Sequence, residues 1–124
     1  MNIAVIGAGS WGTALTSVLS QKQKVSWWIR SNKNLEHIKK FKRNPSYLTN
    51  LTLNTNNITF FNNIDDVLKI NDLIIVAIPS EFLFSTFLNK GPLLNNKIIL
   101  SATKGVIPER LITPHSFFAS INNN

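Results

Sequence analysis

The sequence of 124 residues contains no cysteine, which excludes a disulfide scaffold, a thiolate metal site and a cysteine nucleophile. It also lacks long hydrophobic runs. The longest, such as Asp72–Pro79 and Lys97–Ala102, are far shorter than the roughly 20 residues that a membrane-spanning helix needs. No basic region precedes the first strand-like run at residue 2, so we expect no signal peptide. These absences favour a cytoplasmic protein without a membrane partner.

Acidic residues are few, six against thirteen lysines and arginines, which gives a formal net charge of +7. Eight of the thirteen basic residues fall between Lys22 and Arg43, and such a cluster could suit nucleic acid, a membrane surface or a phosphorylated small molecule. A drift of the composition toward Asn, Ile and Lys is the stronger explanation of the charge. Because no aromatic-plus-basic array of the kind that stacks bases is evident, we expect no nucleic-acid partner.

The length fits one domain with a real core. Short apolar runs alternate with helix-like segments along the chain, and this alternation predicts an α/β fold whose parallel sheet is built from βαβ units. Several runs are apolar at nearly every position, as expected for strands that helices cover on both faces. The five runs are Asn2–Gly7, Lys24–Ile29, Ile58–Phe61, Asp72–Ile78 and Lys97–Ala102.

Helix signals lie between these runs. The first helix is predicted to open near Ser10, because apolar residues recur behind it at three- and four-residue spacing, as in an amphipathic helix. Those apolar residues are Trp11, Leu15, Val18 and Leu19. Further helices are predicted over about Asn34–Lys42, over Ile64–Ile70 with Asn63 as its cap, and after Pro79-Ser80, while Asn50–Asn57 is expected to be a solvated loop.

The segment from Gly7 to Gly12 has the form G-x-G-x-x-G. It follows a buried-type strand and opens an amphipathic helix, the context that a dinucleotide pyrophosphate site requires. Gly7 permits the tight turn, Gly9 lets the backbone approach the pyrophosphate, and Gly12 lets helix and strand pack closely. The pattern predicts a Rossmann-type doubly wound sheet with a dinucleotide on the helix N-terminus. The alternative is a glycine-rich turn without a ligand.

The end of the second apolar run bears on which dinucleotide binds. A site selective for NAD normally has Asp or Glu there, whereas this chain has Arg30, followed by Ser31 and Asn32. A guanidinium can pair with a 2′-phosphate in fork geometry, and the next two side chains add neutral donors. We therefore expect the site to accept NADP or NAD and to prefer NADP, against the alternative that Arg30 is an ordinary surface arginine.

The ends of the later runs face the same edge of the predicted sheet. Pro79 ends the fourth run, and Ser80 could either cap the next helix or contact the cofactor. After the fifth run, Lys104 stands beside Gly105. Its ammonium could meet a substrate phosphate or carbonyl oxygen, or it could simply be solvated.

Taken together, these segments resemble the N-terminal domain of bacterial NAD(P)-dependent glycerol-3-phosphate dehydrogenases. The opening from Ile3 to Leu15, with a tryptophan inside its glycine motif, is close to the family's signature. Three further segments look like family motifs in the family's order and spacing. They are Asn44-Pro45-Ser46-Tyr47-Leu48, Ala77-Ile78-Pro79-Ser80 and Thr103-Lys104-Gly105-Val106.

The resemblance implies roles for matching positions. Ser10, Trp11, Tyr47 and Pro79 would contact the dinucleotide together with the three glycines, Arg30 and Ser31 would face its adenosine phosphate, and Lys104 would lie near both nicotinamide and substrate. The small-molecule substrate would be dihydroxyacetone phosphate or sn-glycerol 3-phosphate, interconverted by reversible hydride transfer for phospholipid synthesis.

The family's catalytic base is a different lysine in a helical C-terminal domain, which this sequence is expected to lack. The family's glycine-rich segment after the fifth strand is also not found. We expect residues 1–110 to form the Rossmann domain and 111–124 a divergent or truncated tail. We expect the chain to be the cofactor-binding part of a glycerol-3-phosphate dehydrogenase. The alternative is a non-catalytic NADP-binding fragment or a decaying gene product. Oligomeric state is left open.

Overall fold

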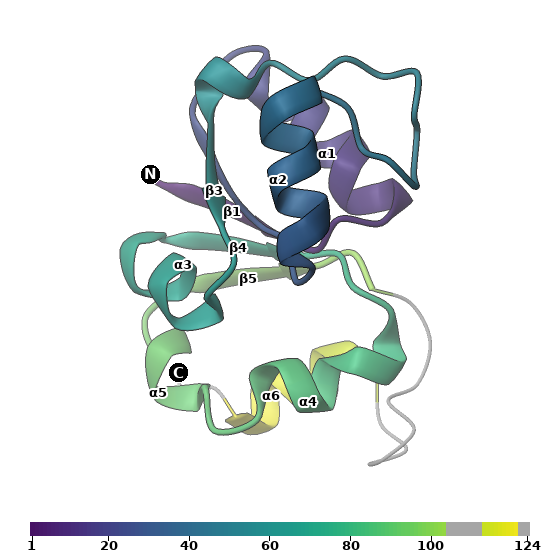
Figure 1. The fold of residues 1–124 in the computed structure, drawn as a ribbon. Coiled ribbons are helices and arrows are strands. Elements are labelled where there is room, and N and C mark those ends of the chain that lie inside the picture. Colours follow the sequence, from purple (N-terminus) through teal and green to yellow (C-terminus); the bar gives the residue numbers. More distant parts are fainter. Residues whose placement is uncertain (104–112, 122–124) are drawn as a thin grey trace.

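The computed structural model describes residues 1–103 and 113–121. They form an α/β domain in which helices surround one sheet (Figure 1). The strands are β1 (Ile3–Ile6), β2 (Val25–Trp28), β3 (Ile58–Phe61), β4 (Leu73–Val76) and β5 (Ile98–Ser101). The α-helices are α1 (Ser10–Ser20), α2 (Asn32–Phe41), α3 (Ile64–Ile70), α4 (Leu83–Phe87), α5 (Gly91–Leu94) and α6 (Pro114–Ile121), with short 3-10 turns η1 (Thr55–Asn57) and η2 (Ser80–Phe82).

All five strands are parallel, in the order β3-β2-β1-β4-β5. The first strand of the chain is thus the central one, and the sheet is wound outward from it in both directions. In register, Val5 of β1 lies between Trp27 of β2 and Ile75 of β4. The predicted α/β class and doubly wound parallel sheet are confirmed. Each strand falls inside the apolar run that predicted it.

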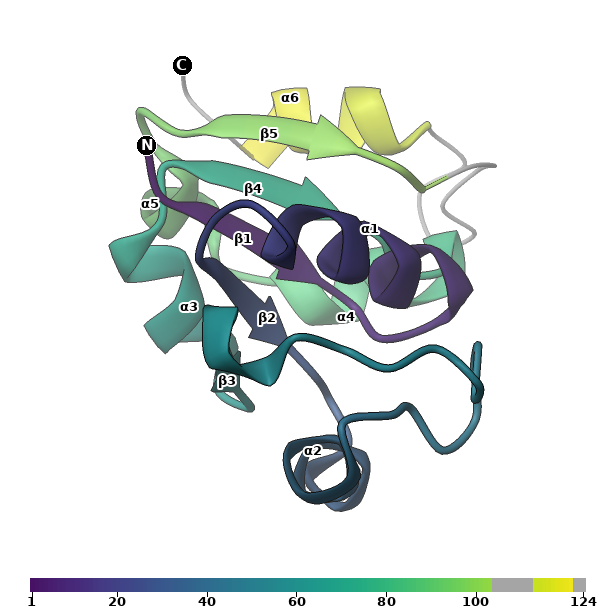
Figure 2. The same ribbon diagram turned by 90° about the horizontal axis from the view of Figure 1, so that it is seen from above.

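Helices cover both faces of the sheet. Figures 1 and 2 show α1 and α2 on one side and α3, α4, α5 and α6 on the other. Each side has its own buried apolar cluster, one built around Trp27 and Ile38 and the other around Leu68 and Phe87. Because strand residues alternate between these clusters, an apolar side chain is needed at nearly every strand position.

The amphipathic pattern predicted α1 correctly and identifies its inner face only in part, since Leu15 and Leu19 pack against the core around Trp27 and two other predicted residues do not. Trp11 and Val18 are 62% and 65% exposed. The buried residues of α1 are instead small, namely Gly12, Thr13, Thr16, Ser17 and Ser20. Helical carbonyls satisfy two of the buried hydroxyls, since Thr16 Oγ1 donates to Gly12 O at 2.7 Å and Ser20 Oγ donates to Ser17 O at 3.1 Å. Small side chains therefore allow α1 to lie close to the sheet.

Local hydrogen bonds shift two of the predicted helix boundaries. Helix α2 begins two residues before the predicted Asn34, because Ser31 Oγ accepts the Asn34 N–H at 3.2 Å and caps the helix. Ser80 does not cap a helix. It begins the turn η2, which the hydrogen bond from the Phe82 N–H to Pro79 O closes at 2.9 Å, and α4 starts only at Leu83. The predicted cap at Asn63 is confirmed, since Asn63 Oδ1 accepts the N–H groups of Asp65 and Asp66.

Two further expectations hold only in part. The segment Asn50–Asn57 is not wholly a solvated loop, because it contains η1 and Asn57 Nδ2 donates to Ser20 O at the end of α1, at 2.7 Å. Helices do not cover both faces of β5, since Ile98 and Leu100 are exposed. Within residues 1–103 and 113–121, no helix is both long and apolar enough to cross a membrane.

Helix α6 belongs to the same core as α4 and the sheet. The Phe118 ring packs edge-on against Phe87, with centroids 5.1 Å apart, and Phe117 is buried beside it. The domain boundary that we expected at residue 110 lies outside the described residues. The contacts of α6 tie residues 114–121 to the α4 side of the sheet.

Replacing Phe117 by Ala should therefore lower the free energy of unfolding by about 3–5 kcal/mol, the cost of removing a buried aromatic side chain. Urea denaturation followed by circular dichroism measures it. Phe41→Ala, at an exposed phenylalanine of α2, is the matched control and should change stability by less than about 0.5 kcal/mol. Equal effects of the two substitutions would show that α6 does not pack on the core.

Candidate dinucleotide-binding site

The turn between β1 and α1 is held from both neighbouring strands. Gly7 has φ +120°, and a Cβ there would collide with the carbonyl oxygen of Ala77 after β4. From the other side, Gly7 N–H donates to Trp28 O at 3.1 Å, and the buried indole Nε1 of Trp27 donates to Gly7 O at 2.7 Å. Only glycine fits a position with this backbone angle and this approach to a neighbouring strand.

The other two glycines of the motif differ in what surrounds them. A Cβ on Gly12 would overlap the carbonyl group of Gly7, so α1 packs directly on the turn that precedes it. A Cβ on Gly9 would meet no protein atom within 4 Å. The fold itself thus requires Gly7 and Gly12, whereas the space beside Gly9 is open.

That open space lies at the N-terminus of α1. Gly9 is the N-cap residue and makes no side-chain cap hydrogen bond. The first N–H groups of a helix have no intrahelical acceptor and carry the positive end of the helix dipole. An anion that approaches over Gly9 can therefore reach these N–H groups with no side chain between.

A pocket of about 290 Å³ extends from this helix end along the carboxyl ends of β1, β4 and β5. It brings together four residues that we predicted to be cofactor ligands from separate segments, in addition to Gly9: Ser10, Trp11, Tyr47 and Pro79. The rest of the lining is Ala77, Ile78, Ala102 and Thr103. Gly7 and Gly12 shape the turn next to the pocket without lining it. The residues fit a dinucleotide, with an anion cradle at one end and apolar and aromatic walls beyond it.

Asn44 connects the glycine turn to the Tyr47 segment, a role that sequence reasoning missed. The residue is only 2% exposed, and its side chain uses both ends of its amide. Nδ2 donates to Ala8 O and to Thr13 Oγ1, each at 3.0 Å, while Oδ1 accepts the N–H groups of Ser46 and Tyr47. The signal for the second half was present, since Asn-Pro commonly starts a side-chain-capped turn.

Thr103 joins the ends of β5 and β4, because its Oγ1 donates to Ile78 O at 2.7 Å. The next residue, Lys104, lies outside the described residues.

Arg30 and Ser31 do not line the pocket at Gly9, which we call the main pocket. Arg30 borders a neighbouring pocket, also about 290 Å³, together with Trp28, Ile64, Ser85, Thr86 and Lys90. The Oγ of Ser31 accepts the N–H of Asn34 as a helix cap, which leaves its own proton available to another acceptor. A ligand that contacted Gly9 and Arg30 together would have to extend from one pocket to the other.

Asn62 fixes the backbone of this segment and was also missed. Its Nδ2 donates to Ile29 O at 3.0 Å and to Arg30 O at 2.9 Å, and its own carbonyl oxygen accepts the Trp28 indole N–H at 2.8 Å. The residue that follows β3 thus holds the residues that follow β2.

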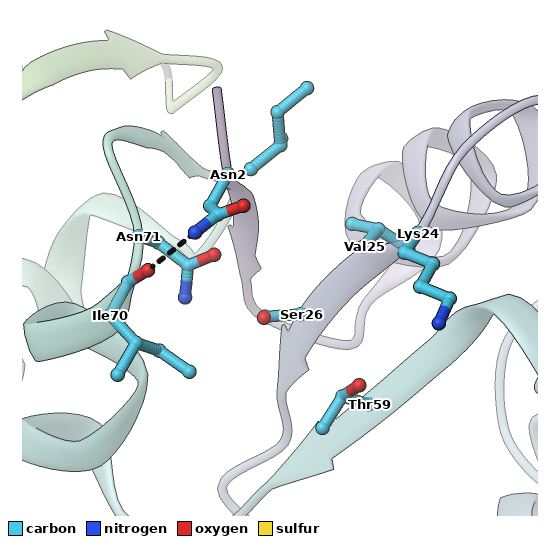
Figure 3. A pocket seen from close by; sticks show the side chains of 8 residues that line it. Asn2, Lys24, Val25, Ser26, Thr59, Ile70 and Asn71 are labelled. Carbon is cyan, nitrogen blue, oxygen red and sulfur yellow. Dashed lines mark hydrogen bonds between the residues drawn. The ribbon is translucent and has the colours of Figure 1, made fainter.

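A further depression of about 220 Å³ lies at the opposite end of the sheet (Figure 3). Polar side chains of Asn2, Lys24, Ser26 and Thr59 line it, and Asn2 Nδ2 donates to Ile70 O across it at 3.2 Å. Ligands of open parallel sheets bind at the carboxyl ends of the strands, and this depression is at the amino ends. Among the described residues, no group of His, Asp or Glu is arranged to hold a metal ion.

A parallel sheet in this strand order, with a glycine turn that opens onto a helix N-terminus at its carboxyl edge, defines a dinucleotide-binding domain of the Rossmann class. Residues 2–121 match the family described as NAD-dependent glycerol-3-phosphate dehydrogenase N-terminus. The chain belongs to that family, and the resemblance drawn from its motifs is confirmed.

Individual relatives of this chain carry the same family name. A glycerol-3-phosphate dehydrogenase (NAD(P)+) of Brachyspira hyodysenteriae is 33% identical over 86% of this chain, and one of Agathobacter rectalis is 34% identical over 90%. The crystal structure of glycerol-3-phosphate dehydrogenase from Coxiella burnetii superposes with a TM-score of 0.87 at 28% identity, covering 99% of this chain and 38% of that one. The expected cofactor class, NADP or NAD, agrees with these names. The chain spans about a third of the length of the two curated relatives, 32% and 33%.

The two helix-end glycines should respond differently to the same substitution. Gly12→Ala should destabilise the fold by about 3 kcal/mol or more, because its Cβ meets backbone that cannot move aside. Gly9→Ala should cost less than about 1 kcal/mol, since its Cβ enters open space. Thermal and urea unfolding of the two variants measure the loss of stability in each. A Gly9→Ala variant as unstable as Gly12→Ala would contradict the packing described above.

Asn44→Ala should lower the free energy of unfolding by about 2 kcal/mol or more, because it leaves the buried groups around the side chain without partners. Asn56→Ala, at an exposed asparagine, serves as the control and should stay within about 0.5 kcal/mol of the parent chain. Urea denaturation gives both values. Indistinguishable variants would mean that Asn44 does not hold the two segments together.

Proposed function

We propose that this chain binds NADP(H) or NAD(H) and forms the cofactor-binding part of a glycerol-3-phosphate dehydrogenase. The reduced dinucleotide supplies the hydride that converts dihydroxyacetone phosphate to sn-glycerol 3-phosphate, a reaction that serves phospholipid synthesis. The observation that carries the proposal is the open space beside Gly9 at an uncapped helix N-terminus. The protein's own packing does not require glycine there, whereas a pyrophosphate on the backbone does.

The proposed roles follow the two pockets. The N–H groups of the first turn of α1 bind the pyrophosphate beside Gly9 and Ser10, while Trp11, Tyr47 and Pro79 border the nicotinamide half. Arg30 and Ser31 receive the adenosine half, and the charge of Arg30 favours NADP over NAD. The family resemblance gives Lys104, the residue after Thr103 in the sequence, a contact between its ammonium and the substrate phosphate. The proposal includes a cytoplasmic location, where such water-soluble phosphates are found.

A second candidate function is dinucleotide binding without catalysis. It is favoured by the lining of the pocket at Gly9, which offers helix N–H groups and apolar and aromatic walls for a dinucleotide. Hydride transfer needs the ketone to be oriented and its oxygen protonated, and the family resemblance gives the base to a domain beyond the matched residues.

NADPH should bind this chain saturably, and Gly9→Val should weaken binding at least about tenfold, because its methyl groups occupy the path of the phosphate to the helix N–H groups. Isothermal titration calorimetry measures both affinities. Thr52→Val, at an exposed loop residue that lines neither pocket, is the control and should bind like the parent chain.

Oxidation of NADPH on addition of dihydroxyacetone phosphate then separates the two functions. Turnover by this chain, alone or with the remaining part of a relative supplied separately, supports the dehydrogenase. Binding without turnover in either format supports the non-catalytic module. A cooperatively folded chain that binds no dinucleotide would overturn both.

A further inference from the structure

Arg30 and Phe82 meet across the end of the central strand. Arg30 follows β2 and Phe82 follows β4, the two strands that flank β1. The guanidinium carbon of Arg30 lies over the Phe82 ring, 5.5 Å from its centroid. The Phe82 N–H donates to Pro79 O at 2.9 Å, which ties the ring to the residue that borders the main pocket.

The backbone and the side chain of Arg30 are held by different residues. Asn62 fixes the backbone through the carbonyl oxygens of Ile29 and Arg30. Among residues 1–103 and 113–121, no carboxylate forms an ion pair with Arg30, and the ring of Phe82 is its aromatic contact. The direction of the guanidinium therefore depends on the phenyl ring.

An aromatic face attracts a guanidinium through its positive charge and is not a hydrogen-bond acceptor that competes with a phosphate oxygen. The N–H donors lie in the guanidinium plane and stay free for a forked pair with a phosphate. An arginine without such a support must lose side-chain freedom when it binds a phosphate. A ring that already orients the guanidinium lowers this entropic cost without occupying its donors.

We propose that Phe82 is a positioning residue that holds Arg30 ready for the 2′-phosphate of NADP, so that the preference for NADP over NAD depends on both side chains. This inference rests on the proposed function, since it deepens the account of how the same site selects its dinucleotide. It also gives η2 a role, because this turn places Phe82 beside the end of β2.

The test compares the affinities of the intact chain for NADPH and for NADH by calorimetry. Phe82→Leu should weaken NADPH binding by roughly two- to fivefold, as expected for the loss of a partly exposed cation–π contact, and leave NADH binding unchanged. Phe82→Tyr keeps an aromatic ring at this position, so the ratio of the NADPH and NADH affinities should equal that of the parent chain. Phe41→Leu is the matched control, because it removes another exposed phenylalanine that pairs with a cation, Lys40, 5.3 Å from its ring centroid.

A double-mutant cycle isolates the role of Arg30. In an Arg30→Gln background, Phe82→Leu should no longer change the NADPH affinity. The inference is overturned if Phe82→Leu weakens both dinucleotides equally, if it changes neither, or if the parent chain binds both with the same affinity. A parent chain that binds neither dinucleotide contradicts the proposed function itself, which distinguishes the two failures.

Discussion

The direct contact between α1 and the turn before it is the constraint on which the site depends. With no side chain at Gly12, the helix begins against the Gly7 carbonyl, and its N-terminus points along the carboxyl edge of the sheet. The same carbonyl oxygen accepts a hydrogen bond from the buried indole N–H of Trp27, so the position of the turn is set by β2 as well as by α1. The anion cradle is thus a consequence of backbone packing, and no charged side chain is required to build it.

The sequence predicted the parts of this structure that depend on local pattern. Apolar runs located all five strands, and the glycine spacing located the turn, since both signals lie within a few consecutive residues. The side chains that join segments could not be found in this way. Trp27, Asn44 and Asn62 bond to carbonyl oxygens 20, 36 and 33 positions away, and their partners are defined only once the strands have paired. In Asn44, the local half of the network had a sequence signal and the distant half had none.

Helix α1 shows where a correct pattern was physically incomplete. Hydrophobic periodicity assumes that burial follows apolar area, but here the distance between helix and sheet decides which face is inside. Threonine and serine are small enough for that distance, and the hydroxyls of Thr16 and Ser20 bond to carbonyls of their own helix, so burying these two side chains leaves neither hydroxyl unpaired. The larger Trp11 is consequently left at the pocket, and the residue that breaks the expected burial is one that borders the candidate site.

The central place of β1 has a consequence for how the chain folds during synthesis. The strand made first must wait for β4, and the hydrogen bond from the Asn2 N–H to Asp72 Oδ2 closes a loop of 70 residues. Closing so long a loop is entropically costly and slow. Until Ala77 has left the ribosome, one side of the most buried strand has no partner and the cofactor turn lacks one of its walls. Once β1 has emerged from the ribosome, the unpaired N–H and C=O groups of this edge therefore stay exposed until β4 follows, a period in which chaperone binding would matter more than the stability of the finished domain.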